Sequence, residues 1–438
     1  MTMRRCAIVI CALGAAVPVS GQDAQLSDAA LAAAIQAYLT PAAAQLSGNL
    51  LVARGDRVVF ERSYGMASHE LRVPFNAATP TAVASITKPL TVLVATRLVN
   101  EGRLSLDDTV SRWLPEFLHG HRMTVRQLIG HRAGIPHRLL PDEAQNQPRT
   151  ASDMVAAANA LPLLFPPGER YSYSSGGYSI LAAVLERAGG ASYDGLLQKY
   201  VVAISGSRLL RHIDRRELLV GRATSGIAVG DRIINAPLRD LSFLVGAGSV
   251  YSTPRDVLPI IHALTRGLYG SMATGYLVDS TGFAWSGITN GFRAIADWYR
   301  KDSLTVLFFG NVLTGAVELM RRDIPRLARG EITAAMTIPR IIATPLRVAV
   351  QERIAGDYDA GDGVKVTLRF LSSTLALFGE RALVPLDDTT LFSPSDYAHV
   401  TVARVNSGQP VVMQWGPSAA RAGTASRPFT KVNPRLVQ

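Results

Sequence analysis

Ser85 and Lys88 stand three residues apart, directly ahead of the apolar run Pro89–Val99. If a helix begins near Ser85, positions i and i+3 share one face, so the Lys88 amine can reach the Ser85 hydroxyl. A neutral hydroxyl is a poor nucleophile, and a neighbouring amine that accepts its proton is one standard way to activate it. The spacing alone is weak evidence, because so short a motif also arises by chance. It predicts nucleophilic chemistry only together with other motifs.

Three further segments follow the Ser-x-x-Lys motif along the chain. The set is Val83–Lys88 with LVNEGRLSLDDTVSRWLP at 98–115, TVRQLIGHRAGIP at 124–136, FPPGERYSYSSGGY at 165–178 and AGSVYSTPRD at 247–256. Together they resemble the serine β-lactamase and penicillin-binding-protein superfamily. The resemblance is closest to the branch of class C β-lactamases, D-aminopeptidases and β-lactamase-like carboxylesterases. It covers most of residues 48–315 and implies a serine hydrolase.

The resemblance implies a catalytic group of Ser85, Lys88 and Tyr173. Ser85 would attack an acyl carbon, Lys88 would help to take its proton, and a covalent acyl-enzyme would form. Tyr173 would accept the serine proton or protonate the leaving group. A tyrosinate is costly, with a reference pKa of about 10, but a close ammonium lowers that cost. The alternative is that Tyr173 is one more core aromatic residue.

The oxyanion that develops in acyl transfer needs two fixed donors, commonly backbone N–H groups. In the resembled fold these would be the N–H groups of Ser85 and Ile288. Trp285-Ser286-Gly287 stands where the family's third motif is expected, which usually begins with Lys or His and ends in Gly. Gly287 would let the substrate approach the strand backbone closely.

Ser175, Trp285, Ser286 and Gly287 are the expected substrate-binding residues, and two of them depart from the family pattern. Ser175 stands in place of an asparagine and lacks the reach and the second donor of an amide. Trp285 replaces a cation, so a substrate carboxylate would gain no charge partner there. β-Lactams and D-Ala-D-Ala peptides carry such a carboxylate, whereas neutral esters do not. The departures therefore favour ester or amide hydrolysis, with Arg293 or another arginine as an alternative source of charge.

The eight histidines show no metal-ligand spacing that carboxylates or cysteines would complete. His131 falls in one of the family-like segments, where the resemblance makes it a structural residue, and direct chemistry is the less favoured alternative. No Gly-rich phosphate loop is present, and no nicotinamide or flavin fingerprint follows a strand. We therefore expect neither a metal nor a cofactor.

The composition is that of a globular protein, with 48% hydrophobic and 18% charged residues in a chain of 438. The formal net charge is +11, but no basic run is interleaved with aromatic residues, so nucleic acid is a poor candidate partner. A weak attraction to an anionic cell envelope would need no dedicated site. We expect a small-molecule ester, amide or peptide as the partner, and the oligomeric state is not predicted.

The N-terminus has the pattern of an export signal. An arginine pair precedes the apolar stretch Cys6–Val17, and small residues follow up to Gly21. This order predicts a signal peptide over residues 1–21 and a periplasmic or secreted protein. A membrane anchor is the rival interpretation, but the stretch is shorter than the ~20 residues that a span needs. Because Cys6 and Cys11 both lie in this segment, the mature protein would have no disulfide and no cysteine nucleophile.

The remaining pattern predicts a mixed α/β (α+β) domain over residues 25–340. A hairpin is expected at Gly48–Ala67 and two more strands at Phe292–Trp298 and Leu304–Val312. The helix from about Ser85 to Asn100 has apolar residues all the way round, which is typical of a buried central helix. Strands at both ends of a helical block indicate one antiparallel sheet packed against helices, the β-lactamase/transpeptidase-like arrangement.

From about Leu346 the pattern changes to short β-like runs separated by Gly, Asp, Ser and Pro. This predicts a small all-β accessory domain over residues 346–420, which resembles the lipocalin-like or small-barrel extensions found in the family. It would cover the mouth of the active site or simply dock on the catalytic domain. Residues 421–438 are polar and basic, and we expect them to form a flexible tail.

These observations predict an exported serine hydrolase that acts through a covalent acyl-enzyme on ester or amide substrates. One alternative is a D-Ala peptidase or β-lactamase that acts on cell-wall peptides or β-lactams at the same site. Another is a binding protein that keeps the cleft without the chemistry. The changes at Ser175 and Trp285 motivate this second alternative, whereas the intact Ser85, Lys88 and Tyr173 argue against it.

Overall fold

The architecture was taken from a computed structural model. It describes residues 25–229, 232–333, 337–359, 365–379, 381–396, 398–404, 411–416 and 428–432. The predicted signal peptide, residues 1–21, lies outside the described residues. Within the described ranges, no helix combines the length and the apolar character needed to cross a membrane.

A five-stranded antiparallel sheet organises the larger domain, with the strand order β10-β11-β12-β1-β2. Its strands are β1 (Gly48–Arg54), β2 (Arg57–Tyr64), β10 (Gly282–Thr289), β11 (Phe292–Tyr299) and β12 (Leu304–Gly310). The sheet joins the two ends of the domain, because β1 pairs with β12 in a register that sets Val52 opposite Val306. The predicted antiparallel sheet is thereby confirmed.

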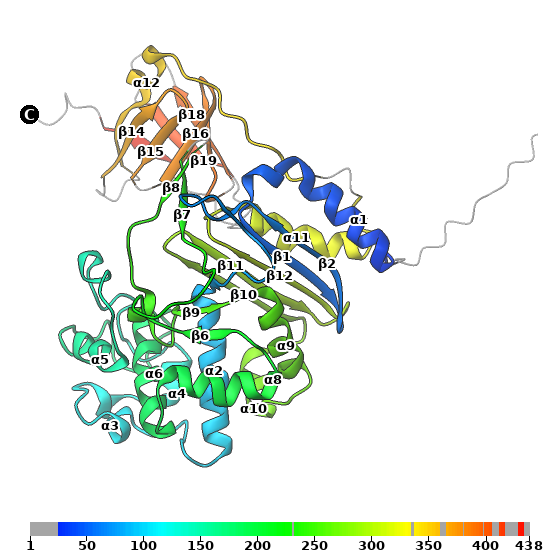
Figure 1. Ribbon diagram of the computed structural model, residues 1–438. Helices are drawn as coiled ribbons and strands as arrows, with labels where there is room; N and C mark the ends of the chain where they lie inside the picture. Colours follow the sequence, from blue (N-terminus) through cyan, green and yellow to red (C-terminus); the bar gives the residue numbers. More distant parts are fainter. Residues whose placement is uncertain are drawn as a thin grey trace, which may run out of the picture.

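Helices cover both faces of this sheet (Figure 1). On one face lie α1 (Asp28–Leu39) and α11 (Ala316–Ala328), which share a buried cluster with Ile295 and Phe308. The opposite face of the same strands packs into the main helical core through residues such as Phe309. Strands buried on both faces read as continuous apolar runs, and β12 (LTVLFFG) shows this pattern. The two layers therefore sandwich the sheet.

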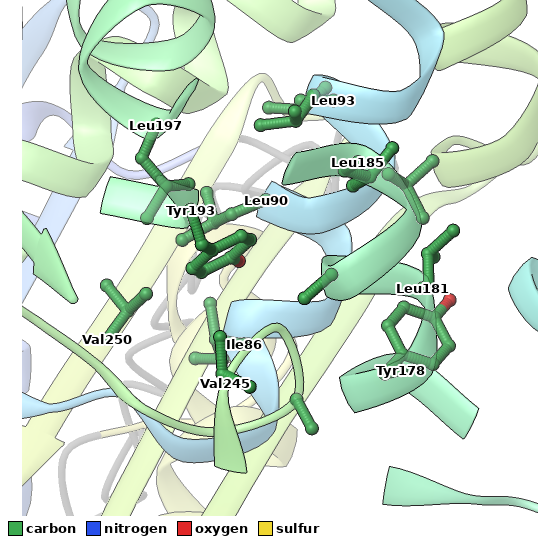
Figure 2. Packing of buried hydrophobic residues seen from close by; sticks show 14 of the residues in the cluster. Ile86, Leu90, Leu93, Tyr178, Leu181, Leu185, Tyr193, Leu197, Val245 and Val250 are labelled. Carbon is green, nitrogen blue, oxygen red and sulfur yellow. The ribbon is translucent and has the colours of Figure 1, made fainter. Parts of the chain in front are cut away.

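The central helix α2 (Thr87–Asn100) fills the middle of the main core. Figure 2 shows Leu90 and Leu93 of this helix surrounded by Tyr193, Leu197 and Leu185 from the neighbouring helices. The expected buried helix is confirmed, with one local difference. A short 3₁₀ turn, η2 (Ala84–Ile86), precedes α2.

Shorter elements complete the larger domain (Figure 1). The helices are α3 (Val110–Trp113), α4 (Val125–Ile129), α5 (Ala151–Asn159), α6 (Ser175–Gly189), α7 (Tyr193–Leu197), α8 (Ala203–Ser205), α9 (Pro254–Thr265) and α10 (Ser271–Leu277). The strands are β3 (Met66–Ser68), β4 (Val73–Pro74), β5 (Thr81–Ala82), β6 (Leu210–His212), β7 (Gly226–Val229), β8 (Arg232–Asn235) and β9 (Val250–Ser252). Strand β9 bridges β5 and β6, and this small sheet holds the entry to η2.

The C-terminal domain is a closed antiparallel barrel of strands β13 to β20, preceded by α12 (Val348–Ile354). Its strands are β13 (Gly356–Asp359), β14 (Lys365–Ser372), β15 (Leu375–Phe378), β16 (Arg381–Asp387), β17 (Thr390–Ser393), β18 (Ala398–Arg404), β19 (Val411–Trp415) and β20 (Phe429–Lys431). The expected all-β domain is therefore present, in the form of a closed barrel.

One boundary has to be corrected. Residues 421–438 were expected to form a flexible tail outside the barrel, but Phe429–Lys431 is strand β20, which pairs with both β13 and β19. Phe429 also packs edge-on against Phe378 and Trp415 inside the barrel. Closing a barrel requires a partner for the first strand, and the polar flanks of this short segment concealed that partner.

The barrel touches the larger domain beside the hairpin β7–β8 (Figure 1). Backbone hydrogen bonds link Gly315 N to Pro394 O at 2.9 Å and Thr344 N to Pro385 O at 2.8 Å. A cavity of about 320 Å³ lies at this junction and is lined by Ala228 of the hairpin and by Val384 of the barrel.

Candidate active site

Ser85 lies between a lysine and a tyrosine that come from two different parts of the chain. Its Oγ is 3.3 Å from Lys88 Nζ, and it accepts a hydrogen bond of 2.8 Å from the hydroxyl of Tyr173. Ser85 sits in the η2 turn and Lys88 in the first turn of α2, so the three-residue spacing brings them together as expected. Tyr173 belongs to the extended segment that leads into α6.

Lys88 is buried, with 5% of its surface exposed, and each of its hydrogen-bond partners is neutral. Besides Ser85, its Nζ contacts Ser175 Oγ at 3.1 Å and donates to the carbonyl oxygen of Ala247 at 2.9 Å. Burial without a counter-charge disfavours the ammonium and lowers the pKa of Lys88 to about 7. At neutral pH a large share of the amine is therefore free to accept a proton.

Tyr173 has the opposite tendency. Burial raises the pKa of its phenol, and the hydrogen bond to Ser85 offsets only part of this effect. The phenol therefore keeps its proton at neutral pH and donates it to Ser85. Of the two base candidates, Lys88 has the suitable protonation equilibrium, and Tyr173 is suited to act as an acid.

His131 and His137 hold the segment that carries Tyr173. His131 Nδ1 accepts a hydrogen bond from Ser174 N at 3.1 Å, and His137 Nδ1 accepts one from Ser175 N at 3.2 Å. The His131 ring also lies 4.6 Å, centroid to centroid, from the ring of Tyr173. Burial lowers the pKa of His131 to about 4, and the pKa of His137 is lowered as well, so both rings are neutral acceptors. These contacts support the structural role expected for His131.

The turn before Ser85 is strained. Ala84 has a φ of 49° and is 1% exposed, and a left-handed conformation costs an L-residue on the order of 1–2 kcal/mol. Such strain is often stored where a functional group must be held in one orientation. At Gly287 of β10, an added Cβ would lie 2.3 Å from Val83 O and 3.0 Å from Ser85 N. The glycine is thus needed because the strand passes directly against the turn.

The backbone of β10 brings Ile288 to the same place. Asn290 and Gly291 both have positive φ, at 42° and 84°, which is the signature of a two-residue type I′ hairpin turn. Such a turn makes Thr289 and Phe292 the hydrogen-bonded closing pair. The next pair, Ile288 with Arg293, is then non-hydrogen-bonded, and the N–H of Ile288 points away from β11. This geometry supports the predicted oxyanion donors, Ser85 N and Ile288 N, and their role stays a prediction.

A cleft of about 620 Å³ opens beside Ser85. It is lined by Ser85, Ser175 and Ile288, together with Thr289 and Gly291 at the end of β10. Its apolar walls include Leu139, Leu140, Met154, Ile227, Phe243, Leu244 and Leu313. Its other polar and charged residues include His137, Arg138, Gln145, Arg239 and Asn290.

Trp285 and Ser286 do not line this cleft. The Trp285 ring stacks on Phe283 with a centroid distance of 4.1 Å and packs on the main core. The pleat of β10 directs Ser286 to the opposite face from Gly287, where its hydroxyl accepts a hydrogen bond of 2.8 Å from Arg293. Gly287 is not a lining residue either. The prediction that these three residues bind substrate therefore gains no support from the cleft, whereas Ser175 does line it.

Arg293 was the alternative charge partner for a substrate, and the structure places it elsewhere. It is 3% exposed and forms an ion pair with Glu318 of α11. Its Nη1 also donates to Gly287 O at 3.2 Å and to Ala294 O at 2.9 Å. The Arg293 guanidinium is therefore paired inside the protein, where it links β10 to α11.

Two features of the site had little signal in the sequence. The carbonyl of Ala247 is a backbone group, so no residue type announces its contact with Lys88. His137, Arg138 and Arg239 are ordinary polar residues in loops that only the fold brings together. His137 directly follows the Gly-Ile-Pro turn, which was the one available hint. Among the described residues, no group of three or more His, Cys, Asp or Glu side chains has metal-binding geometry.

Comparisons with known proteins agree with this geometry. The family model described as Beta-lactamase matches residues 31–328. The putative penicillin-binding protein PbpX of Bacillus subtilis is 24% identical over 285 residues, which cover 62% of this chain and 72% of PbpX. The esterase EstB of Burkholderia gladioli is 32% identical over 176 residues, which cover 36% of this chain and only 45% of EstB.

A solved structure shows the same fold. The D-amino acid amidase of Ochrobactrum anthropi SV3, solved with L-phenylalanine amide, superposes with a TM-score of 0.60 at 19% identity. The match covers 69% of this chain and 99% of the amidase. The family model, the ordered motifs and the Ser85–Lys88–Tyr173 geometry lead to one conclusion. The chain belongs to the Beta-lactamase family of serine hydrolases.

Proposed function

We propose that this protein is an exported hydrolase that cleaves ester or amide substrates through a covalent acyl-enzyme on Ser85. The observation that carries the proposal is the position of Ser85 Oγ, 3.3 Å from the Lys88 amine and 2.8 Å from the Tyr173 hydroxyl. A nucleophile with a base and an acid in direct contact has the parts that acyl transfer needs.

In the first half-reaction, neutral Lys88 accepts the Ser85 proton while Oγ attacks the acyl carbon. The N–H groups of Ser85 and Ile288 stabilise the oxyanion. The leaving group then departs with a proton from Tyr173, and the Lys88 ammonium returns a proton to the resulting Tyr173 phenolate. In the second half-reaction a water molecule takes the place of the leaving group, which releases the acid and restores Ser85.

Ester or amide substrates without a carboxylate near the start of β10 fit this site best. Trp285 supplies no charge there, and the Arg293 guanidinium is tied to Glu318. The esterase identity of EstB and the amidase identity of the Ochrobactrum protein support the same substrate classes.

The second candidate function is cell-wall peptide or β-lactam chemistry at the same serine. It is supported by the similarity to PbpX, which spans 72% of that protein. Release of D-alanine from a D-Ala-D-Ala peptide, or turnover of a chromogenic cephalosporin, would favour it. A binding protein without chemistry is the third candidate, and it would give no covalent adduct of the folded protein with a reactive fluorophosphonate.

Hydrolysis of p-nitrophenyl butyrate by the mature protein and by Ser85→Ala tests the proposal. We expect turnover that disappears in Ser85→Ala while the thermal transition is kept, and that survives in the control Ser63→Ala on β2. Ester turnover that persists in Ser85→Ala would reject Ser85 as the nucleophile. Signal cleavage is tested separately, by N-terminal sequencing of protein expressed from the full chain, and we expect the mature chain to begin close to residue 22.

A further inference from the structure

Two arginines, Arg138 and Arg239, line one wall of the Ser85 cleft, and none of the described lining residues is acidic. Asp142 stands next to this wall. Its Oδ1 lies 3.8 Å from Arg138 Nη1 and 3.4 Å from Arg239 Nη2. One carboxylate therefore faces two guanidinium groups, and the wall keeps an excess of one positive charge.

Arg239 is the better fixed of the two arginines. Its side chain is 26% exposed, compared with 73% for Arg138. The backbone next to it is held by Asp240, whose N–H donates to Gln145 O at 2.8 Å and whose carboxylate accepts from Arg215 N at 2.9 Å. A held, planar guanidinium suits bidentate recognition of a carboxylate, because little side-chain freedom is lost on binding.

Gln145 belongs to the same wall and holds Asp142. The residue is 3% exposed, and its Nε2 donates to Leu140 O and to Asp142 Oδ1, both at 3.1 Å. These two acceptors fix the orientation of the amide. Its Oε1 is buried and has no hydrogen-bond partner among the described residues. An acceptor left unpaired in this way costs on the order of 1–3 kcal/mol. Because Oε1 is buried, Gln145 acts in this wall by holding Asp142 in place, not by direct contact with a ligand.

We propose that this wall binds a carboxylate in the acyl part of the substrate, with Arg239 as the main contact and Arg138 as a more exposed second cation. The proposal rests on the proposed function. Tyr173, which protonates the leaving group in that reaction, does not line the cleft. The proposal assigns the Tyr173 side to the leaving group and the cleft to the acyl chain. The preferred substrates are then esters or amides of acids that carry a second, free carboxylate.

A matched pair of esters tests the site. Mono-4-nitrophenyl adipate carries the free carboxylate, and methyl 4-nitrophenyl adipate is its neutral counterpart. We expect kcat/KM for the free acid to exceed that for the methyl ester by about tenfold or more after subtraction of spontaneous hydrolysis. In Arg239→Gln this ratio falls to within about twofold of unity. The control Arg187→Gln, which changes a surface arginine paired with Glu116, keeps the wild-type ratio.

The ratio of the two kcat/KM values is measured on one protein preparation. A lower fraction of active protein reduces both values equally and leaves the ratio unchanged. A wild-type ratio near unity, or a ratio that Arg239→Gln leaves unchanged, overturns the carboxylate site while Ser85-dependent turnover of the neutral ester still supports the proposed function. If neither ester is turned over, the proposed function fails, and the carboxylate site is then tested by measuring how tightly the two esters bind. The dissociation constants of both esters for Ser85→Ala, measured by calorimetry, then support it if the free acid binds at least tenfold tighter and overturn it if the two are equal.

Discussion

Lys88 Nζ lies 2.9 Å from the carbonyl oxygen of Ala247, closer than the 3.3 Å that separates it from Ser85 Oγ. A carbonyl oxygen can only accept, so this contact occupies an N–H of the lysine in either protonation state. The hydroxyl of Ser175 takes a second N–H at 3.1 Å. In the neutral amine both N–H groups are used by these two bonds, so the single lone pair points toward Ser85. There it can accept the proton of the hydroxyl, as a general base must.

The first prediction concerns the pH dependence of ester hydrolysis. Burial lowers the pKa of Lys88 to about 7, and the base is active in its neutral form. We expect kcat/KM for p-nitrophenyl butyrate to be constant above this pKa and to fall about tenfold per pH unit well below it. A profile that stays flat down to pH 5.5 would show that Lys88 is not the base. Lys88→Arg, which cannot deprotonate near neutral pH, should be inactive across the whole range.

The second prediction concerns stability. The pKa of Lys88 is lowered from 10.5 to about 7 on folding, so the unfolded chain binds the extra proton between these two values. The burial penalty is therefore complete below pH 7 and diminishes as the pH rises toward 10.5. Lys88→Met removes the penalty. The free energy of unfolding of this variant minus that of wild type should therefore be larger at pH 6 than at pH 9, by about 2–3 kcal/mol.

Urea denaturation of both proteins at the two pH values measures this difference. The exposed Lys365→Met on β14 serves as the control and should show no comparable change with pH. Equal effects of Lys88→Met at pH 6 and pH 9 would mean that Lys88 keeps an ordinary pKa in the folded protein.

The third prediction separates the two roles of Tyr173. Tyr173→Phe keeps the ring that packs against His131 and removes only the hydroxyl. An acid is most important when the leaving group is a poor one. We therefore expect kcat to fall about 10²–10⁴-fold for an ethyl ester and much less for the p-nitrophenyl ester of the same acid. Equal losses for both esters would instead assign Tyr173 to the removal of the serine proton.

The fourth prediction concerns the ion pair beneath β10. Arg293 and Glu318 are both largely buried, with side-chain exposures of 3% and 15%. Glu318→Ala leaves the guanidinium without its carboxylate and should lower the free energy of unfolding by about 3 kcal/mol. Glu331→Ala, which removes a more exposed carboxylate paired with Arg329, should cost less than about 1 kcal/mol. Similar values for the two variants would show that the Arg293 charge is not buried in solution.

Much of this site was predictable because it rests on local sequence. Ser85 and Lys88 meet through the geometry of one helical turn. Gly287 was expected to admit the substrate, but its missing side chain instead leaves room for the backbone of the turn at Ser85. The contents of the cleft were not predictable. Arg138 and Arg239 are 101 positions apart in the chain, and only the packing of two loops places them on one wall. Strand β20 was missed because it is a short segment with polar flanks, and because one of its two partners, β13, is distant in the sequence.

The hairpin β7–β8 separates the active-site cleft from the cavity at the barrel junction. Ile227 lines the cleft, and the adjacent Ala228 lines the other cavity, because successive residues of a strand point to opposite sides. Insertion or deletion of a single residue at the start of β7 would therefore exchange the two side chains. A small alanine would then face the cleft, which would become wider without any change of residue types. Length variation in this one hairpin is thus a simple evolutionary route to bulkier substrates.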